Sequence, residues 1–111
     1  MLFFKLTGVR IERFGIMYCI YVTFKCFPGK REEYVKLLNE KGYLEEIRKE
    51  DGCIRYDYYF SEKDENELLL IEMWESKAHQ QAHIETPHMK VVLPLGKDYI
   101  MDKKLGEFNL L

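Results

Sequence analysis

Three histidines and the only tryptophan of the chain lie within one segment, residues 74–90. Imidazole and indole side chains can ligate a metal or haem, transfer protons, or stack on an aromatic ring. His79 and His83 are four residues apart, which places both on one face of a helix. A stable zinc site needs at least a third protein ligand, and the segment contains no HExxH sequence. The pattern therefore disfavours a metal site.

Proton transfer is the alternative chemistry, and His83 and His88 are the candidate bases. His88 falls in the first turn of a helix predicted to start at Thr86-Pro87. The helix dipole opposes a positive charge there and favours the neutral imidazole, which accepts a proton. His83 is interpreted as a base in a pocket or as a histidine at the edge of the core, and His88 as a base or a solvated first-turn residue. His79 is interpreted as a packing or partly exposed side chain.

Trp74, Glu72, Tyr56 and Tyr58 are the candidate contacts to a small molecule. Trp74 is interpreted as a core residue whose ring could also wall an aromatic pocket, with its indole N–H as a donor. Glu72 lies in an apolar strand and, if buried, needs a partner: a histidine, a Lys or Arg side chain, or a backbone group. Tyr56 and Tyr58 share one strand face, so they line a pocket if that face meets helices and an interface if it meets a partner chain.

Composition narrows the class of protein. The 111 residues suit one domain. Seventeen Lys and Arg against nineteen Asp and Glu give a net charge of −2 with interspersed signs, so no nucleic-acid surface is expected. The apolar run at the start is too short for a secretory signal or a membrane span. The odd number of cysteines, without CxxC spacing, predicts reduced thiols in a cytoplasmic protein: Cys19, Cys26 and Cys53.

Hydrophobic periodicity from Met17 onward predicts the order β-α-β-β-α-α-β, a ferredoxin-like α+β fold with an antiparallel sheet. Strands are expected at 17–27, 53–60, 67–75 and 99–111, and helices at 30–50, at 77–85 and from 87 until Pro94 and Gly96. Gly42 weakens the first helix near its middle without ending it. Ser76 and Thr86 are the expected N-caps of the last two helices.

Two of these elements predict how the layers pack. Residues 68–71 form an apolar run without alternation, so both faces of their strand are expected to be covered. Helices cover one face of an open sheet, and the sheet of a second copy is the simplest cover for the other, which predicts a homodimer. The side of the helix at 77–85 expected to pack against the sheet carries Ala78, His79, Ala82 and His83.

The segment "IEMWESKAHQQAHIETPHMK", the "PG" before the first helix and "EDGCIRY" after it resemble the antibiotic biosynthesis monooxygenase superfamily. The closest resemblance is to its bacterial quinol monooxygenase branch, and it covers roughly residues 17–105. It implies a domain of this type at 17–111, of the dimeric α/β-barrel kind, with helices on one face of the sheet and the partner sheet on the other. Residues 1–16 are then an N-terminal extension outside the pocket.

Members of this superfamily are typically homodimers with a pocket between sheet and helices, and several oxidise electron-rich aromatics without metal, flavin or haem. The resemblance implies a cofactor-free monooxygenase or oxidase here. His83 or His88 would deprotonate a small aromatic substrate such as a quinol, which would then react directly with O₂. Trp74 and a tyrosine would hold the ring and its oxygen.

Other chemistries occur on the same fold, and fold carries over better than chemistry. Haem degradation is disfavoured. The haem-degrading branch of the superfamily resembles a pattern with an Asn in the first strand, a Trp late in the motif helix and an axial His ten residues after it. This sequence has no Asn in its first strand, and His83 and Leu93 stand at the other two positions. A small-molecule isomerase and a non-catalytic dimeric ligand-binding protein stay open as alternatives.

Overall fold

The computed structural model describes residues 17–110, so the predicted extension at 1–16 lies outside the described residues. The sheet has four strands in the order β2-β3-β1-β4, and each neighbouring pair is antiparallel. The strands are β1 (Tyr18–Cys26), β2 (Cys53–Phe60), β3 (Glu67–Trp74) and β4 (Ile100–Phe108). The helices are α2 (Arg31–Glu40), α3 (Tyr43–Arg48), α4 (Lys77–Ile84), α5 (Pro87–Leu95) and the short 3-10 helix η1 (Gly96–Asp98). The predicted ferredoxin-like α+β fold is confirmed.

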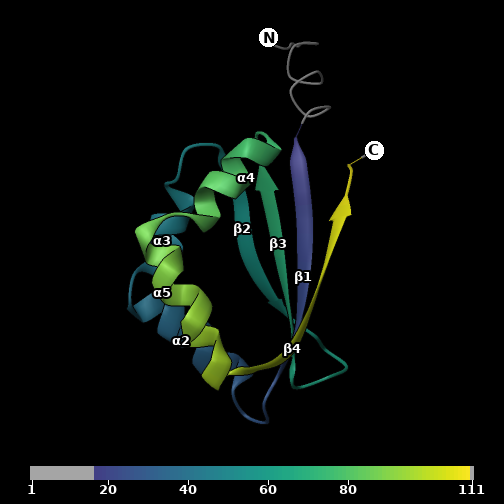
Figure 1. Ribbon diagram of the computed structural model, residues 1–111. Coiled ribbons are helices and arrows are strands. Elements are labelled where there is room, and N and C mark those ends of the chain that lie inside the picture. Colours follow the sequence, from purple (N-terminus) through teal and green to yellow (C-terminus); the bar gives the residue numbers. More distant parts are fainter. Residues whose placement is uncertain (1–16, 111) are drawn as a thin grey trace.

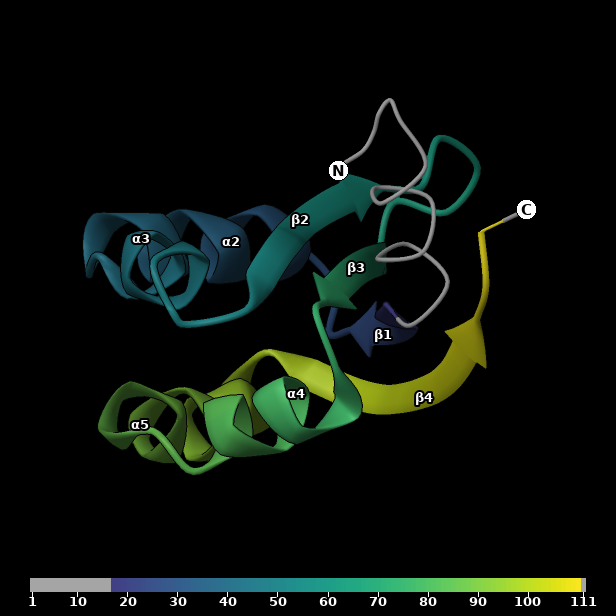
Figure 2. The same cartoon turned by 90° about the horizontal axis from the view of Figure 1, so that it is seen from above.

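All the helices lie on one side of the sheet (Figure 1). Seen from above, α2 and α3 lie toward the β2 edge, and α4 and α5 lie toward the β4 edge (Figure 2). Burial alternates along β3, where Leu68, Leu70, Glu72 and Trp74 are buried and Leu69, Ile71 and Met73 between them are half-buried. The face toward the helices therefore carries the core. Among residues 17–110, no helix is long and apolar enough to cross a membrane.

The single helix predicted at 30–50 is wrong, because Gly42 divides it into α2 and α3. Gly42 has a φ of 77°, a left-handed backbone conformation that glycine adopts without steric cost. Both pieces still bury the core-facing residues of the predicted stripe: Tyr34, Leu38, Leu44 and Ile47. The second piece ends just before Glu50, whose carboxylate contacts side chains of α4 and α5.

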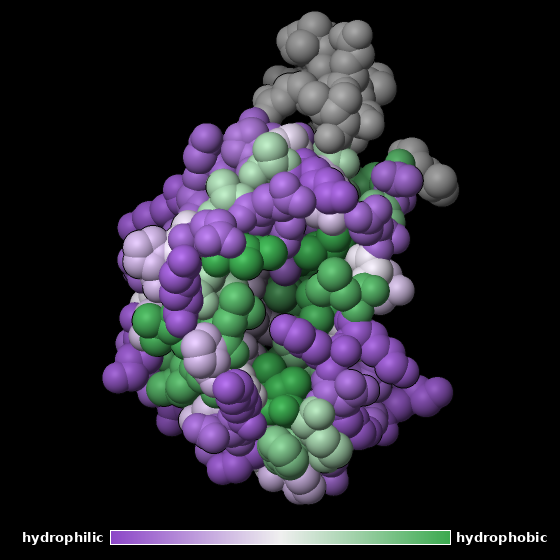
Figure 3. All heavy atoms as spheres, viewed as in Figure 1, coloured by the Kyte–Doolittle hydropathy of each residue, from purple (hydrophilic) through white to green (hydrophobic). Residues whose placement is uncertain are grey.

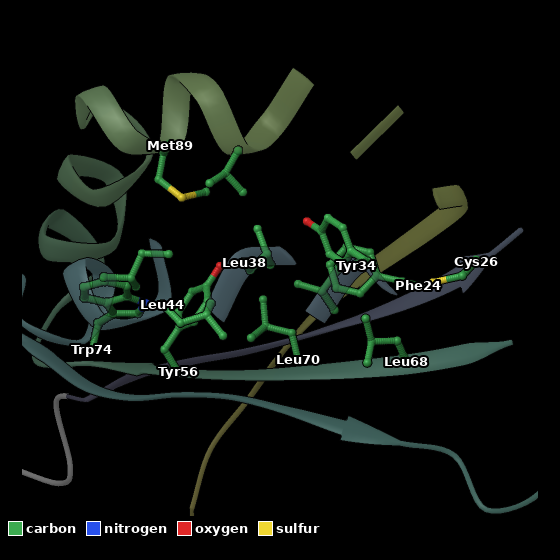
Figure 4. Packing of buried hydrophobic residues seen from close by; sticks show 13 residues of the cluster. Phe24, Cys26, Tyr34, Leu38, Leu44, Tyr56, Leu68, Leu70, Trp74 and Met89 are labelled. Carbon is green, nitrogen blue, oxygen red and sulfur yellow. The ribbon is translucent and has the colours of Figure 1, made fainter. Parts of the chain in front are cut away.

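The core fills the space between the sheet and the helices. Leu68, Leu70 and Trp74 rise from β3, and Tyr56 rises from β2, on the side where Met89 of α5 approaches (Figure 4). Trp74 has no solvent-exposed surface. Its interpretation as a core residue is therefore confirmed.

Both N-caps predicted for the last two helices are confirmed. The Ser76 hydroxyl accepts a hydrogen bond from the backbone N–H of His79, and the Thr86 hydroxyl accepts one from that of Met89. Pro87 occupies the first turn of α5, where its missing N–H costs no helical hydrogen bond. The two caps define where the histidine-bearing helices begin.

The predicted inner side of α4 is wrong for its two alanines. Ala78 and Ala82 are exposed, whereas Gln80 and His83 are the buried residues of this helix. The helix has eight residues and few apolar ones, so hydrophobicity alone does not determine which side faces inward. A polar partner makes burial of His83 possible, because Glu50 accepts a hydrogen bond from its ring.

The sheet face opposite the helices has an apolar centre. Leu69, Ile71 and Met73 of β3 are half-buried there, with Tyr21 of β1 and Tyr59 of β2 exposed on the neighbouring strands. A surface of this kind on a sheet is typical of contact with another protein layer.

Candidate active site

A cavity of about 160 Å³ lies between the sheet and the helices. Apolar side chains form most of its wall, and three of them, Ile84, Leu93 and Leu105, are also exposed. Figure 3 shows a hollow flanked by apolar side chains on the corresponding side of the molecule. The polar lining residues are Tyr34, Tyr56, Tyr58, Glu72, Gln80, His83 and Lys103. An apolar cavity with a few polar groups is the usual form of a small-molecule site.

His83 is the histidine of the motif that lines this cavity. Its side chain is 2% exposed, and its Nδ1 lies 2.9 Å and 3.1 Å from the two carboxylate oxygens of Glu50. An ionised carboxylate only accepts hydrogen bonds, so Nδ1 carries the proton and Nε2 is left with a free lone pair. The ring centroid lies 4.8 Å from that of Trp74 and 5.4 Å from that of Tyr56. These contacts hold the imidazole in one orientation.

The surroundings of His83 favour its neutral form. Burial is the largest influence and lowers the pKa of the imidazole, because a charged ring would lose its hydration. The hydrogen bond to Glu50 and the charge of Glu50 raise this pKa in part, and the charge of His88 lowers it again. At neutral pH the neutral imidazole is therefore favoured, with its one proton on Nδ1 toward Glu50 and Nε2 able to act as a base.

Glu72 and Trp74 form a second polar contact, on the floor of the site. The indole Nε1 of Trp74 donates a hydrogen bond of 2.9 Å to Glu72 Oε1. None of the partners expected for Glu72 from the sequence is the one observed, and the Trp74 N–H is directed to Glu72 rather than to the cavity. Burial raises the pKa of Glu72 to about 7, although the bond from Trp74 opposes this shift. Glu72 can therefore gain or lose a proton near neutral pH.

Tyr56 and Tyr58 both line the cavity, because their face of β2 meets the helices. Burial raises the pKa of each phenol well above its ordinary value. Tyr34 adds a third hydroxyl, and burial raises its pKa to about 12. The three hydroxyls stay protonated at neutral pH. The Tyr58 hydroxyl donates to those of Tyr34 and Tyr56, which leaves the protons of Tyr34 and Tyr56 as the available donors.

His88 does not line the cavity, so of the two candidate bases only His83 reaches it. Its Nε2 lies 2.5 Å from Oε2 of Glu50, the carboxylate that His83 also contacts. The two helices bring both rings to one carboxylate, and the His88 side chain is 13% exposed. His88 is therefore connected to the cavity through Glu50 and His83.

His79 contacts the turn that follows Glu50, at Asp51 and Gly52. Its Nδ1 lies 2.7 Å from the Ser76 hydroxyl, and its Nε2 lies 3.5 Å from Asp51. Its ring covers Gly52, where a Cβ would come within 2.4 Å of the imidazole. This position agrees with the interpretation of His79 as a packing residue. Across residues 17–110, no three His, Cys, Asp or Glu side chains are grouped so that they could hold a metal ion.

Glu50, Gln80 and Lys103 belong to the site but were not predicted from the sequence. Glu50 is 33 residues from His83 and 38 from His88, and nothing local distinguishes it from the other charges of "EEIRKED". Gln80 was not among the residues expected on the inner side of its helix. Residues two apart in a strand share a face, so Lys103 lies on the same face of the last strand as Leu105. This alternation could have identified Lys103 from the sequence.

Comparison with known proteins identifies the family of this chain. Residues 17–93 match the family model described as "Antibiotic biosynthesis monooxygenase". A protein of Synechocystis sp. named as uncharacterized is 36% identical over 76 residues, which are 68% of this chain and 50% of that protein. The chain thus spans about half the length of that relative.

Two further comparisons cover most of both chains. The Escherichia coli protein named "Probable quinol monooxygenase YgiN" is 26% identical over 97 residues, covering 80% of this chain and 93% of that protein. The crystal structure of a conserved protein from Methanosarcina mazei Go1 superposes with a TM-score of 0.79 at 23% identity, covering 89% of this chain and 97% of that one. The structural likeness shows the shared fold.

Proposed function

The chain belongs to the antibiotic biosynthesis monooxygenase family, and from that premise we propose that it oxidises a small electron-rich aromatic, such as a quinol, with O₂. In this proposal no metal, flavin or haem takes part. The substrate binds in the cavity and His83 removes a proton from its hydroxyl. The name of the Escherichia coli relative supports a quinol as the substrate class.

One observation carries the proposal: a buried histidine lines an apolar cavity with its proton fixed on the nitrogen that faces a carboxylate. Such a ring can take up a proton at Nε2 without rotating, and Glu50 stabilises the imidazolium that forms. Glu50 acts through His83 and is a positioning residue. Trp74 packs on the same ring and supports it from the sheet side.

The chemistry follows from removing that proton in a largely apolar cavity. A quinolate is electron-rich enough to pass electrons to O₂ itself, so the substrate performs the role of a cofactor. Oxidation of a quinol by O₂ gives a quinone and hydrogen peroxide, and monooxygenation gives a hydroxyquinone and water. The protonated hydroxyl of Tyr56, oriented by the hydrogen bond that it accepts from Tyr58, can donate a hydrogen bond to the phenolate oxygen, which stabilises the reacting anion.

Oxygen consumption tests this proposal. Metal-stripped, flavin-free protein is given hydroquinones, naphthohydroquinones and anthrones, and the rate is compared with spontaneous autoxidation. We expect acceleration with at least one of them, and peroxide measurement then separates oxidase from monooxygenase. No acceleration across the panel would refute the oxygenase proposal.

An isomerase is the second candidate function, and the protonation of Glu72 favours it. Glu72 and His83 line one cavity, and the pKa of Glu72 is about 7. One group could remove a proton from carbon and the other could return it elsewhere. Turnover without oxygen uptake would identify this function, and binding without any turnover would identify a non-catalytic ligand-binding protein.

We also propose that the chain forms a two-fold homodimer in which the open sheet faces meet. Leu69, Ile71 and Met73, with Tyr21 and Tyr59 beside them, form the apolar centre that such a contact would cover. An interface of more than about 2,000 Å² is expected for an obligate pair. Light scattering at micromolar concentration should give twice the chain mass, and a stable monomer would contradict the proposal.

A further inference from the structure

The Glu50 carboxylate joins the cavity histidine to a histidine outside the cavity. His83 Nδ1 lies 2.9 Å from Oε1 of Glu50, and His88 Nε2 lies 2.5 Å from Oε2. The three side chains are 2%, 11% and 13% exposed in the order His83, Glu50, His88. They form a continuous line of hydrogen bonds from a buried cavity wall to a group that solvent can reach.

We propose that this line is a proton relay, in which Glu50 and His88 carry the proton that His83 takes from a ligand to solvent and back. This inference deepens the proposed function and rests on it for the source of the proton. Glu50 and His88 do not line the cavity, so they serve as positioning and relay residues. Of the three side chains of the relay, His83 is the one that touches the ligand.

The transfer can be written atom by atom. The transfer is written from the form of the line in which Glu50 is the carboxylate, His83 carries its proton on Nδ1 and His88 is the imidazolium. The substrate hydroxyl proton moves to His83 Nε2, the His83 Nδ1 proton moves to Glu50, and the His88 Nδ1 proton moves to water. One proton enters the line and one leaves it, so the three side chains hold the same number before and after.

A quinol and O₂ give a quinone and hydrogen peroxide with no net release of protons. A proton that leaves the quinol early in the reaction must therefore return later, and the relay provides the path for both steps. Sending the proton out leaves the quinolate without a cation beside it, which keeps it electron-rich while it reacts with O₂. The same path in reverse returns the proton to the reduced oxygen. Without an exit, the imidazolium would stay in contact with the anion and stabilise it against oxidation.

The groups that face this line act on it through their charges. Glu72 of β3 is the nearby carboxylate, and its repulsion with Glu50 favours a proton on one of the two. Tyr56 and Cys53 of β2 also feel the charge of Glu50, and burial keeps both protonated by raising their pKa values. Arg48 of α3 donates to the backbone oxygen of Tyr56. Within residues 17–110, the hydrogen-bond partners of the Glu50 carboxylate are thus the two imidazoles.

The relay can be tested without a substrate. In protein labelled with ¹⁵N-histidine, NMR measures how fast the Nδ1 proton of His83 exchanges with water. His88→Phe keeps a ring in place and removes both nitrogens, and Glu50→Gln keeps the side-chain size and removes the proton acceptor. We expect both variants to slow the exchange. His79→Gln is the matched control, since His79 contacts Asp51 and not Glu50, and it should leave the exchange unchanged.

Turnover gives a second readout, with a substrate from the oxygen-uptake panel. His88→Phe should lower turnover about tenfold, less than the roughly 10²-fold or more expected for losing the base itself, because His83 remains. Free imidazole in the buffer should restore the His88→Phe variant and not a His83→Gln variant, an effect that a purely structural role would not produce.

The outcomes separate the two proposals. Exchange that is as fast in His88→Phe and Glu50→Gln as in the wild type would overturn the relay, whatever the turnover results. Slower exchange in a protein that oxidises no quinol would support the relay and refute the proposed function. If His88→Phe does not fold, the Glu50→Gln measurement decides alone.

Discussion

Two buried polar clusters lie at different places against the same sheet. They differ in whether a polar group keeps a lone pair or a proton that is not used in a hydrogen bond. In the first, Arg31 of α2 donates from Nη1 to the backbone oxygens of Ser61, Asp64 and Glu67 at 3.0–3.1 Å. Its guanidinium carbon also lies 4.6 Å from the centroid of the Phe60 ring. Nη1 of Arg31 thus holds the loop between β2 and β3, while Nε and Nη2 donate to the carboxylate of Glu32.

In the second cluster the hydrogen bonds leave one nitrogen of each imidazole unused. Glu50 accepts from His83 and His88, but each imidazole uses one nitrogen only for that contact. The free nitrogen of His83 belongs to a side chain on the cavity wall. Burial of a charged or titratable group therefore does not by itself indicate function. What distinguishes the two clusters is whether a lone pair or a proton remains available toward a cavity.

The largest expected effect separates activity from folding. His83→Gln should lower turnover by about 10²- to 10⁴-fold, the usual contribution of a general base, because glutamine cannot take up the substrate proton. Far-UV circular dichroism and the melting temperature should stay close to those of the wild type, since glutamine can still donate to Glu50. A variant with full activity would break the comparison, because the second cluster would then be as structural as the first.

The next effect concerns pH and stability. Glu72 has a pKa of about 7 in the folded protein, above its value in an unfolded chain, so the folded state binds the proton more tightly. The raised pKa therefore adds to the free energy of unfolding below the unfolded pKa. This gain, on the order of 3 kcal/mol, is lost as pH rises toward 7. Glu72→Gln should gain stability relative to the wild type between pH 5 and pH 8 in urea unfolding. A difference that does not change with pH would contradict the shifted pKa.

The smallest expected effect lies in the first cluster and has the opposite pattern. Arg31→Met should lower the free energy of unfolding by about 2 kcal/mol, because loop carbonyls lose a charged donor that is mostly buried. Turnover per folded molecule should not change, since Arg31 does not line the cavity. Lys30→Met, beside it on the surface, is the matched control and should change stability little. A large loss of turnover in Arg31→Met would mean that the loop cluster also shapes the site.

Local signals in the sequence were enough for most of the fold. The caps at Ser76 and Thr86 and the strand Cys53–Phe60 were predicted because side-chain chemistry and alternation act within a few residues. The break at Gly42 was underestimated, since its cost in a continuous helix competes with packing that the sequence does not display. The inward side of α4 was misjudged because Gln80 is buried by its position on the cavity and not by its polarity.

The candidate site was only partly accessible from the sequence. His83, Tyr56, Tyr58 and Glu72 were named as candidates, and all four line the cavity. Glu50 was missed because its contacts with the histidines depend on where the end of α3 meets α4 and α5, which is a property of the whole fold.

Deprotonation of a bound quinol tests the central claim, that His83 is the base, more directly than any rate. A naphthohydroquinone is mixed with the protein under strictly anaerobic conditions, and its absorption spectrum is recorded at a pH where the free quinol is neutral. The account predicts the red-shifted spectrum of the quinolate with the wild type and the spectrum of the neutral quinol with His83→Gln, at matched occupancy. A bound quinol that stays neutral in the wild type, or that ionises equally in His83→Gln, would contradict the assignment of His83 as the base.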